Sequence, residues 1–264
     1  MTSNTSQRPI VLCFSGHDPG GGAGIHADIE AIGALGGHAL TIITAQTVQD
    51  TRNVERVVPT EITLLAEQIV ALSADSVISA IKVGLLGDAA QISVIARTAQ
   101  HLGVPLVLDP ILRAGGGNNL ASNATIMAMQ TELFPLTTVL TPNAAEARRL
   151  APGCDTVTES ALALLEAGCA NVLVTGGDEP SDDVVNSWHR PNHAAQAFHW
   201  PRLPETFHGA GCTLASAIAA LLAQGREIGE ALEQAQAYTQ RALQNAQRTG
   251  QSRRIPGRLR TGSQ

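Results

Sequence analysis

The alternation of short apolar runs with longer helical patterns constrains the fold of this chain more than any other feature. The runs 9–15 (PIVLCFS), 105–108 (PLVL) and 171–175 (NVLVT) have the length of buried strands, whereas 60–74 places its apolar residues on one helical face. Repeated strand and helix units form right-handed crossovers and a mostly parallel sheet with helices on both faces. We therefore predict a three-layer αβα fold of the α/β class with a mostly parallel central sheet.

The same reasoning predicts the remaining elements and the shape of one irregular segment. The region 176–202 is polar and contains several prolines, so we interpret it as an edge hairpin or a lid. Further strands are expected at 40–44, 80–83, 138–141, 184–188 and 196–200. Further helices are expected at 24–35, 89–102, 123–133, 144–150, 158–167 and, split near Gly225, across 212–247.

Composition limits the domain organisation and the kinds of partner. With 264 residues, 44% of them apolar, and no long linker, the chain is predicted to form a single domain over 1–264, with 1–8 and 250–264 as flexible tails. The basic run 248–260 is interpreted as part of a solvated tail. The net charge of −6 disfavours a nucleic-acid or membrane-surface role, and no apolar stretch is long enough for a transmembrane helix. The four cysteines lack metal-ligand spacing and no secretory signal is present, which together favour a cytoplasmic location.

A glycine-rich loop follows the first expected strand, in the sequence SGHDPGGGAGIHAD at 15–28. Its glycines allow the backbone to approach a ligand closely, and Asp18 and Asp28 bracket it with carboxylates. The spacing matches neither the P-loop nor the dinucleotide-binding fingerprint. The alternative is a flexible turn in which Asp18 caps the next helix.

Acidic and amide side chains follow two other expected strands. Asp109 ends the strand at 105–108, where a carboxylate can hold a cation or orient a phosphate, and the alternative is an ordinary aspartate that caps the loop. Asn143 and Glu146 lie three residues apart at a helix start and can share one face. They can act on a magnesium-bound water, or they can form a capping box that only begins the helix.

The sequence FHGAGCT, at 207–213, opens an apolar helix with very small residues. The amides of Gly209, Ala210, Gly211 and Cys212 can face a ligand, and the helix dipole favours an anion there. The same field is expected to lower the pKa of the Cys212 thiol. The alternative is a tight turn with a buried, inert cysteine.

These motifs carry a family resemblance. The segment GHDPGGGAGIHADIEAIGALGGHALTIITAQTVQDT, followed in order by LDP at 108–110, TPNAAEA at 141–147 and HGAGCTLASAIAA at 208–220, resembles the hydroxymethylpyrimidine/phosphomethylpyrimidine kinases of thiamine biosynthesis. The matches span residues 10 to about 245. The resemblance implies a ribokinase-like fold, phosphorylation of a pyrimidine alcohol and then of its monophosphate, ATP and Mg²⁺ as cofactors, and a homodimer.

The resemblance also implies roles for individual residues. Asp28 and Gln49 would hold the pyrimidine ring. Asn143 and Glu146 would act on magnesium through water, with Asp109 near the ion. Cys212 would take the proton of the attacking hydroxyl while the amides of its turn stabilise the moving phosphoryl group. The implied pyrimidine pocket also includes Gly16, Thr47, Leu85 and Leu112, the implied nucleotide site includes Asn143, Thr175 and Gly177, and the turn is Gly209, Ala210, Gly211 and Cys212.

Three departures from the family pattern keep other functions open. Thr175 stands where relatives often carry Lys, Phe207 replaces a polar residue, and the stretch GQSRRIPGRLR lacks the C-terminal glycine-rich pattern. Arg113 is a candidate to supply the missing phosphate contact. A pyridoxal/pyridoxine kinase and a non-catalytic pyrimidine-binding protein are the alternatives, and whether both phosphorylation steps occur stays open.

Overall fold

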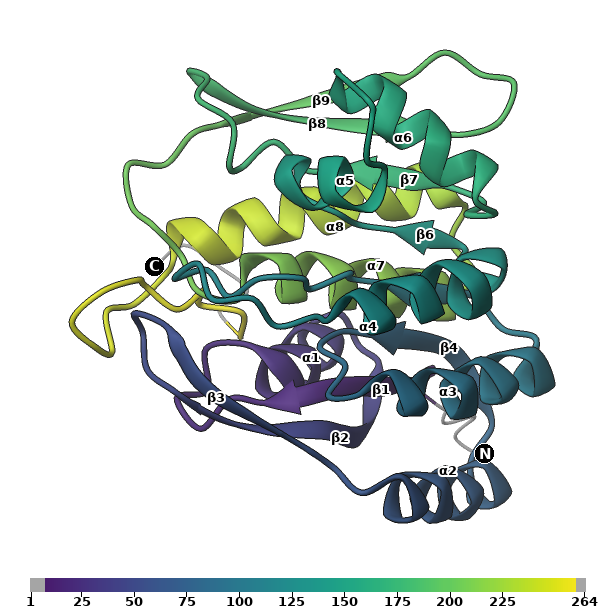
Figure 1. Ribbon diagram of the computed structural model, residues 1–264. Helices are drawn as coiled ribbons and strands as arrows, with labels where there is room; N and C mark the ends of the chain where they lie inside the picture. Colours follow the sequence, from purple (N-terminus) through teal and green to yellow (C-terminus); the bar gives the residue numbers. More distant parts are fainter. Residues whose placement is uncertain (1–7, 260–264) are drawn as a thin grey trace, which may run out of the picture.

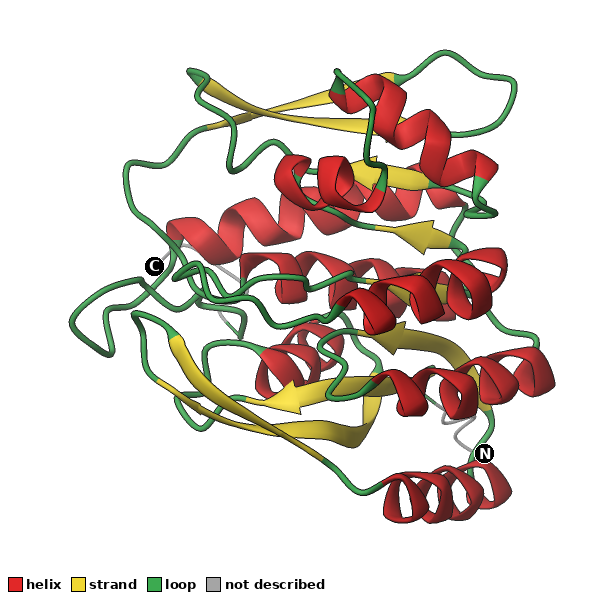
Figure 2. Ribbon diagram, viewed as in Figure 1, coloured by secondary structure: helices red, strands yellow, loops and turns green. Residues whose placement is uncertain are grey.

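The computed structural model describes residues 8–259, and within this range nine strands form one sheet in the order β3-β2-β1-β4-β5-β6-β7-β8-β9. Figures 1 and 2 show helices on both faces of this sheet. In this order, the neighbouring strands β2, β1, β4, β5, β6 and β7 pair in parallel. Strand β3 at one edge and strands β8 and β9 at the other pair antiparallel. The predicted three-layer αβα fold with a mostly parallel sheet is confirmed.

The elements follow the predicted order. The strands are β1 Ile10–His17, β2 His38–Gln49, β3 Val54–Pro59, β4 Ile78–Val83, β5 Leu106–Leu108, β6 Val139–Leu140, β7 Val172–Val174, β8 Asp183–His189 and β9 Gln196–Pro201. The helices are α1 Gly24–Ala34, α2 Ile62–Asp75, α3 Ala89–Leu102, α4 Asn123–Ala128, α5 Ala144–Leu150, α6 Val157–Glu166, α7 Ala210–Ala223 and α8 Ile228–Gln244. A π-helical turn η1 (Met129–Leu133) and a 3-10 turn η2 (Phe134–Leu136) extend α4.

Two apolar clusters, one on each face of the sheet, hold the layers together. Because successive strand residues point to opposite faces, Leu12 and Phe14 of β1 join one cluster, whereas Val11 and Cys13 join the other. The first cluster packs against α2, α3, α5 and α6, and the second packs against α1, α7 and α8. Helix α7 is buried along nearly its whole length, and this packing fixes the position of its first turn relative to the carboxyl ends of the central strands.

The first edge of the sheet differs from the sequence prediction. The strand expected at 40–44 continues as β2 to Gln49, and it pairs with β3, which was not predicted. The sequence VERVVP of β3 contains two charged residues and a proline, so it lacks the apolar run by which the other strands were predicted. An edge strand that faces solvent tolerates such residues. The segment 176–202 forms the edge hairpin β8–β9, which was one of its two interpretations.

The C-terminal segment is not the solvated tail that its charge suggested. Residues 250–259 belong to the described structure, and the Arg258 side chain is buried. Of the two expected flexible tails, 1–7 and 260–264 lie outside the described residues. In the part of the chain that the structure describes, no helix has both the length and the apolarity to cross a bilayer.

Candidate active site

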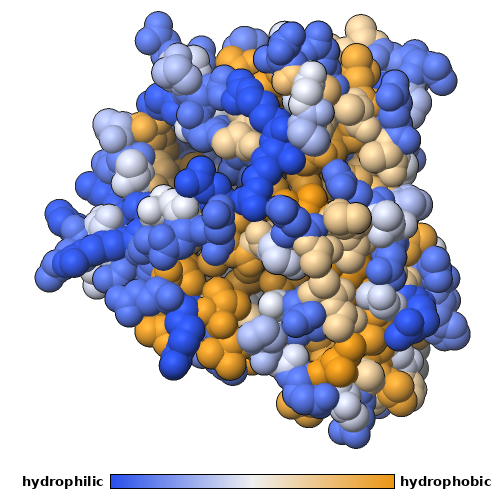
Figure 3. Space-filling view, in the orientation of Figure 1, coloured by the Kyte–Doolittle hydropathy of each residue, from blue (hydrophilic) through white to orange (hydrophobic). Residues whose placement is uncertain are grey.

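A cavity of about 830 Å³ lies beyond the carboxyl ends of the parallel strands. Polar residues crowd the side of the molecule toward which the parallel strands run, at the left of the view in Figure 3. Ligand sites in open α/β sheets are expected at this edge. Of the residues that the sequence analysis named as candidates, those that line the cavity are Gly16, Asp18, Thr47, Gln49, Leu85, Asp109, Arg113, Asn143, Glu146, Thr175, Gly177, Gly209, Ala210, Gly211 and Cys212.

The glycine-rich loop between β1 and α1 is held in place by Asp18. Its carboxylate accepts hydrogen bonds from the amides of Gly20, Gly22 and Ala23 at 2.8–2.9 Å, and His208 Nε2 lies 2.9 Å away. Burial alone would raise the pKa of Asp18, but the hydrogen bonds from His208 and Gly20 hold that pKa below its usual value. Asp18 therefore organises the whole loop instead of acting as the N-cap of α1, which is Ala23.

The turn at the start of α7 is open in the way an anion site requires. Gly209 is its N-cap with φ 87°, a left-handed conformation that favours glycine. Within the described residues no side chain caps this helix, and the first intrahelical bond runs from the Thr213 amide to the Gly209 carbonyl. The amides of Ala210, Gly211 and Cys212 precede that bond and have no intrahelical acceptor. The turn can therefore present three N–H donors to the cavity.

Cys212 lies among charged groups rather than hydrocarbon. The Cys212 side chain is buried, and Lys82, Asp109 and the Gly24 amide lie close enough to influence its pKa. Burial nevertheless raises the pKa of Cys212 to about 12, although the positive charge of Lys82 acts in the opposite direction. The prediction that the helix dipole lowers this pKa is wrong, because the thiol is almost fully desolvated and lies beside two carboxylates.

Asp28 lies beneath the cavity and does not line it. Its Oδ1 atom is 2.8 Å from Lys82 Nζ and accepts a hydrogen bond from Ser216, and the Asp28 and Lys82 side chains are both fully buried. Burial alone would lower the pKa of Lys82, but the negative charges of Asp28 and Asp109 raise it. Lys82 and Ser216 use only Oδ1, whereas the buried Oδ2 atom of Asp28 has no hydrogen-bond partner, so direct contact between Asp28 and a ligand stays a prediction. Lys82 itself was missed, although a lysine between Ile81 and Val83 in a buried strand requires a partner.

Asn143 and Glu146 form the capping box that their spacing allowed. The Glu146 amide donates to Asn143 Oδ1 at 2.8 Å, and Glu146 Oε2 accepts from the Asn143 amide at 3.0 Å. Glu146 Oε1 accepts from the Leu112 amide at 3.2 Å. Burial and the neighbouring charge of Asp109 raise the pKa of Glu146 to about 8.

Asp109 has one buried oxygen, Oδ2, that has no hydrogen-bond partner. Burial raises the pKa of this carboxyl to about 6, while Lys82 acts to lower it. A buried carboxylate with an unused oxygen is costly unless a ligand completes it. Among residues 8–259, no three His, Cys, Asp or Glu side chains come together as a ready-made metal site.

The end of the cavity near β1 and β2 contains the residues that the resemblance assigned to the pyrimidine. Gln49 Nε2 donates to Thr47 Oγ1 at 2.7 Å, and Thr47 Oγ1 donates to the His17 carbonyl at 2.8 Å. A Cβ atom on Gly16 would lie only 2.7 Å from a methyl carbon of Leu85, so a larger residue would push the Leu85 side chain from its place in this wall. Leu112 is not a wall, because its side chain is buried in the core. Ile111 and Leu120 line the cavity instead.

The opposite end of the cavity was largely missed from the sequence. Thr175 and Gly177, which were assigned to the nucleotide, lie there with Asp178, whose carboxylate accepts hydrogen bonds from the amides of Ala144 and Ala145. No sequence motif singles out the apolar members of this wall, because they come from the end of β9, the segment after it and helix α8. They are Trp200, Pro201, Leu203, Pro204, Phe207 and Leu243.

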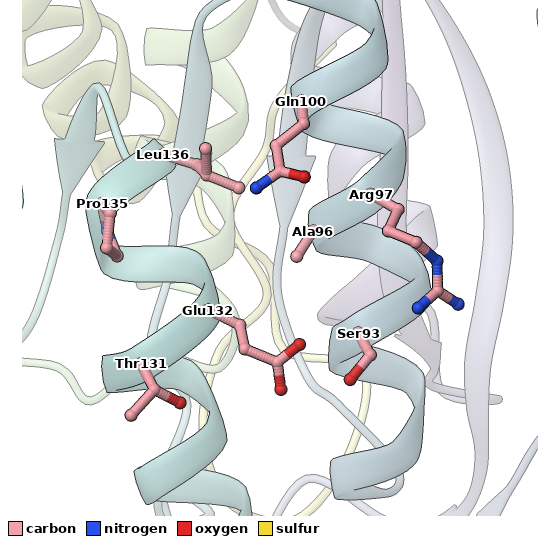
Figure 4. Close-up of a pocket in the computed structure, with 8 residues that line it drawn as sticks. All are labelled: Ser93, Ala96, Arg97, Gln100, Thr131, Glu132, Pro135 and Leu136. Atoms are coloured by element: carbon pink, nitrogen blue, oxygen red, sulfur yellow. The ribbon is translucent and has the colours of Figure 1, made fainter.

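A second cavity of about 220 Å³ lies between α3 and the helical segment 129–136 (Figure 4). Its lining includes Arg97 and Gln100 on one side and Thr131 and Glu132 on the other. None of the glycine-rich turns or strand ends described above contributes to it, so the larger cavity is the candidate active site.

The fold and the site together define a class. A mostly parallel sheet whose strand ends carry a glycine-rich loop, a buried carboxylate and an open helix N-terminus is the arrangement of a ribokinase-like small-molecule kinase. The sequence profile of the phosphomethylpyrimidine kinase family matches residues 18–256. The chain therefore belongs to the phosphomethylpyrimidine kinase family, and it is a kinase.

Individual relatives agree with this assignment. The chain is 36% identical to the thiamine biosynthesis bifunctional protein ThiED of Geobacter sulfurreducens, over 92% of this chain but only 51% of that protein. It is 35% identical to the hydroxymethylpyrimidine/phosphomethylpyrimidine kinase of Salmonella typhimurium, over 91% of this chain and 92% of that protein. An ADP complex of Bacillus subtilis pyridoxal kinase is similar in structure, with a TM-score of 0.86 and 27% identity over 95% of this chain and 97% of that one.

Proposed function

We propose that this protein uses ATP to phosphorylate 4-amino-5-hydroxymethyl-2-methylpyrimidine and then its monophosphate, as a step in thiamine biosynthesis. The observation that carries the proposal is the first turn of α7, whose three N–H groups have no intrahelical acceptor and adjoin Cys212 and Asp109. Such a turn stabilises the charge on a phosphoryl group in transfer. Family membership and the names of the relatives supply the substrate class.

The substrate alcohol would lie between the Gly16–Gln49 end of the cavity and the α7 turn. Its oxygen attacks the terminal phosphorus of ATP, the bond from that phosphorus to the oxygen of ADP breaks, and the hydroxyl proton must leave. The Cys212 thiol is protonated at neutral pH, so it can accept this proton only as its own proton passes to another base, and Asp109 is a neighbouring carboxylate that can take it. We therefore propose a concerted proton relay from the hydroxyl through Cys212 to Asp109.

Positioning and electrostatics would supply most of the acceleration. Phosphoryl transfer has a loose transition state and requires little covalent help from the protein. The amides of Ala210, Gly211 and Cys212 would stabilise the phosphoryl oxygens, and the glycine-rich loop would exclude water from the same space. Proton removal by the relay would contribute a further factor of roughly 10²–10⁴.

The donor set at the strand ends fits Mg²⁺ that arrives with the nucleotide. Asp109 has an unused buried oxygen, whereas both oxygens of Glu146 already accept backbone hydrogen bonds. Asp109 would therefore face the ion, and Glu146 and Asn143 would act on it through water. When bound, the ion would neutralise charge on the phosphates and on these two neighbouring carboxylates.

Product analysis by mass tests the proposal. The protein is incubated with the hydroxymethylpyrimidine, ATP and Mg²⁺, and masses are followed over time. A gain of one phosphate and then a second supports the full function, and a stop after the first would remove the second step. An unchanged substrate mass would overturn the proposed substrate and leave two alternatives, a pyridoxal kinase and a non-catalytic pyrimidine-binding protein, the second of which is motivated by the Thr175 and Phe207 departures.

Pyridoxal is the second candidate substrate, because a pyridoxal kinase shares the fold closely over nearly the whole chain. Its ring also carries a hydroxymethyl group, so the α7 turn would serve it equally. Parallel assays with pyridoxal and the pyrimidine alcohol, compared as kcat/KM, separate the two. A higher kcat/KM for pyridoxal would overturn the proposed substrate.

Two further features belong to this proposal. A homodimer is supported by the family resemblance, and light scattering of the purified protein would test it. A cytoplasmic location is supported by the four cysteines, which are free within the described chain, since reducing compartments keep thiols reduced. Fractionation of cells that produce the protein would check it.

A further inference from the structure

The C-terminal segment returns to the active site after α8 ends at Gln244. It forms an isolated bridge between Phe207 and Arg254, and the His208 amide donates to the Arg254 carbonyl at 2.9 Å. Figure 1 shows this segment, in yellow, at the edge of the sheet where the site lies. The segment therefore packs directly against the residues that lead into the α7 turn.

Arg258, near the end of this segment, is 1% exposed and is a buried charged residue for which the proposed reaction has no role. Its Nε donates to Thr213 Oγ1 at 2.8 Å, and its Nη1 lies 3.0 Å from Glu30 Oε2. Its Nη2 donates to the Gly22 carbonyl. One guanidinium group thus contacts the first turns of α7, helix α1 and the glycine-rich loop.

The two loops that this group joins are already in close contact. A Cβ atom on Gly209 would overlap the Gly22 carbonyl and would lie 2.7 Å from Arg258 Nη2. On the other side of the same pair of loops, Asp18 and His208 form a second connection. The separation between the glycine-rich loop and the α7 turn is therefore set by two polar contacts, and the one at Arg258 is buried.

We propose that Arg258 is a positioning residue, which holds the Gly22 carbonyl and the Thr213 hydroxyl at a fixed separation so that both loops meet the transferred phosphoryl group. This inference rests on the proposed kinase function. The planar guanidinium group donates in three fixed directions at once, whereas the point charge of a lysine cannot reproduce that arrangement. We call Arg258, with Gly22, Glu30 and Thr213, the Arg258 clamp.

The clamp acts on turnover more than on pyrimidine binding. The residues at the pyrimidine end, Gly16, Thr47 and Gln49, have no contact with Arg258 in the hydrogen-bond network. Loss of the clamp should therefore lower kcat by about 10–100-fold, as expected when reacting groups are displaced by a fraction of an ångström or more. The KM for the pyrimidine should stay within about threefold.

The test compares Arg258→Ala, Arg258→Lys and Thr213→Val with the wild type. Arg226→Ala is the matched control, because Arg226 forms an exposed ion pair with Glu230 on helix α8. Steady-state kinetics with the pyrimidine alcohol give kcat and KM for each protein. Free guanidinium at about 10 mM should restore part of the turnover of Arg258→Ala and should leave Arg226→Ala unchanged.

Amide hydrogen exchange provides a readout that does not depend on activity. Peptides that cover 18–24 and 209–213 should exchange faster in Arg258→Lys than in the wild type, while β1 and β4 keep their protection. Unchanged exchange together with an unchanged kcat would overturn the clamp. If the wild type has no kinase activity but the variants exchange faster in these two loops, the proposed function fails and the clamp stands as a structural contact.

Thr213→Val also serves if Arg258→Ala does not fold. It keeps the shape of the side chain, yet it removes the acceptor of Arg258 Nε and the bond from Thr213 to the Gly209 carbonyl. A three- to tenfold fall in kcat with normal thermal stability would support the clamp, and normal kcat would contradict it.

Discussion

Lys82 Nζ lies 2.8 Å from Asp28 Oδ1, and neither side chain is exposed to solvent. Lys82 also donates to Ser15 Oγ at 2.8 Å, and Ser216 donates to Asp28 at 2.6 Å. The pair joins β4 to α1 and α7 beneath the cavity. The positive charge of Lys82 also acts on Asp109, and it opposes the rise that burial causes in the pKa values of Asp109 and Cys212.

Removal of one member of this pair should be strongly destabilising. We expect Lys82→Met to lower the free energy of unfolding by about 3–5 kcal/mol, because it leaves a buried carboxylate without a counter-charge. Adding Asp28→Asn should recover a large part of the loss, because the double variant buries no net charge. Urea denaturation is measured for the wild type, the two single variants and the double variant, and simple additivity of the two single changes would contradict the coupling.

Cys212 should react slowly with alkylating agents in the folded protein. A pKa of about 12 leaves a thiolate fraction on the order of 10⁻⁵ at pH 7, and the side chain is buried. Iodoacetamide at pH 7 should therefore modify the partly exposed Cys154 first, with peptide mass spectrometry as the readout. Rapid modification of Cys212 would show that the thiolate is present in the resting enzyme.

Glu146→Gln should lower magnesium-dependent activity, and its stability relative to the wild type should rise with pH. Gln can keep the acceptor of the capping box, but its NH2 group cannot accept from the Leu112 amide, so the benefit appears only as the wild-type carboxyl ionises. The pKa of Glu146 is about 8 in the folded protein and has the ordinary value of 4.5 in the unfolded chain. Between these two pH values, the folded state therefore keeps a proton that the unfolded chain has lost. Wild-type stability therefore falls as pH rises through this window, and the advantage of the variant should grow from pH 5 to pH 8.

The gain at pH 8 should be on the order of 1 kcal/mol, or about 2–4 °C in Tm for a protein of this size. Glu159→Gln is the matched control, because Glu159 occupies the same capping-box position on α6 but is exposed. Its stability should show no such rise between pH 5 and pH 8. An equal response of the two variants would mean that burial of Glu146 does not control its effect.

Gly209→Ala should abolish most turnover. The new methyl group would overlap the Gly22 carbonyl, so the α7 turn and the glycine-rich loop would have to separate. Gly225→Ala is the control, since Gly225 also has a positive φ, at 77°, but nothing lies within 4 Å of its would-be Cβ. The control should lose about 1–2 kcal/mol of stability and retain its activity. Similar activity losses in both variants would exclude the contact as the cause.

The regular helices and buried strands could be predicted from the sequence because the spacing of their apolar residues and the residues at their ends indicate the same element. Helix α3 has the predicted bounds 89–102, since Asp88 caps its start and Gly103 ends it in a left-handed conformation. Strand β3 could not be predicted in the same way. Its charged residues and proline are compatible with solvent, and only its pairing with β2 makes it a strand.

The candidate active site likewise contains residues that the sequence predicts and residues that only the folded structure reveals. The α7 turn and Asp109 were recognisable, because strand ends and small residues before a helix are local features of the sequence. The ion pair between Asp28 and Lys82 was not recognisable, because it joins residues 54 positions apart in the chain. The apolar wall of Trp200, Leu203 and Leu243 has no sequence spacing that unites it, since tertiary packing alone brings β9 and α8 together.

The burial of Arg258 has a consequence for biosynthesis. Every strand of the sheet and the α7 turn leave the ribosome before this residue does, and chains emerge at about 5–20 residues per second. The sheet can therefore form first, while the glycine-rich loop waits for a contact from the far end of the polypeptide. Competence for phosphoryl transfer would be acquired last, as a separate event that follows the assembly of the body of the enzyme.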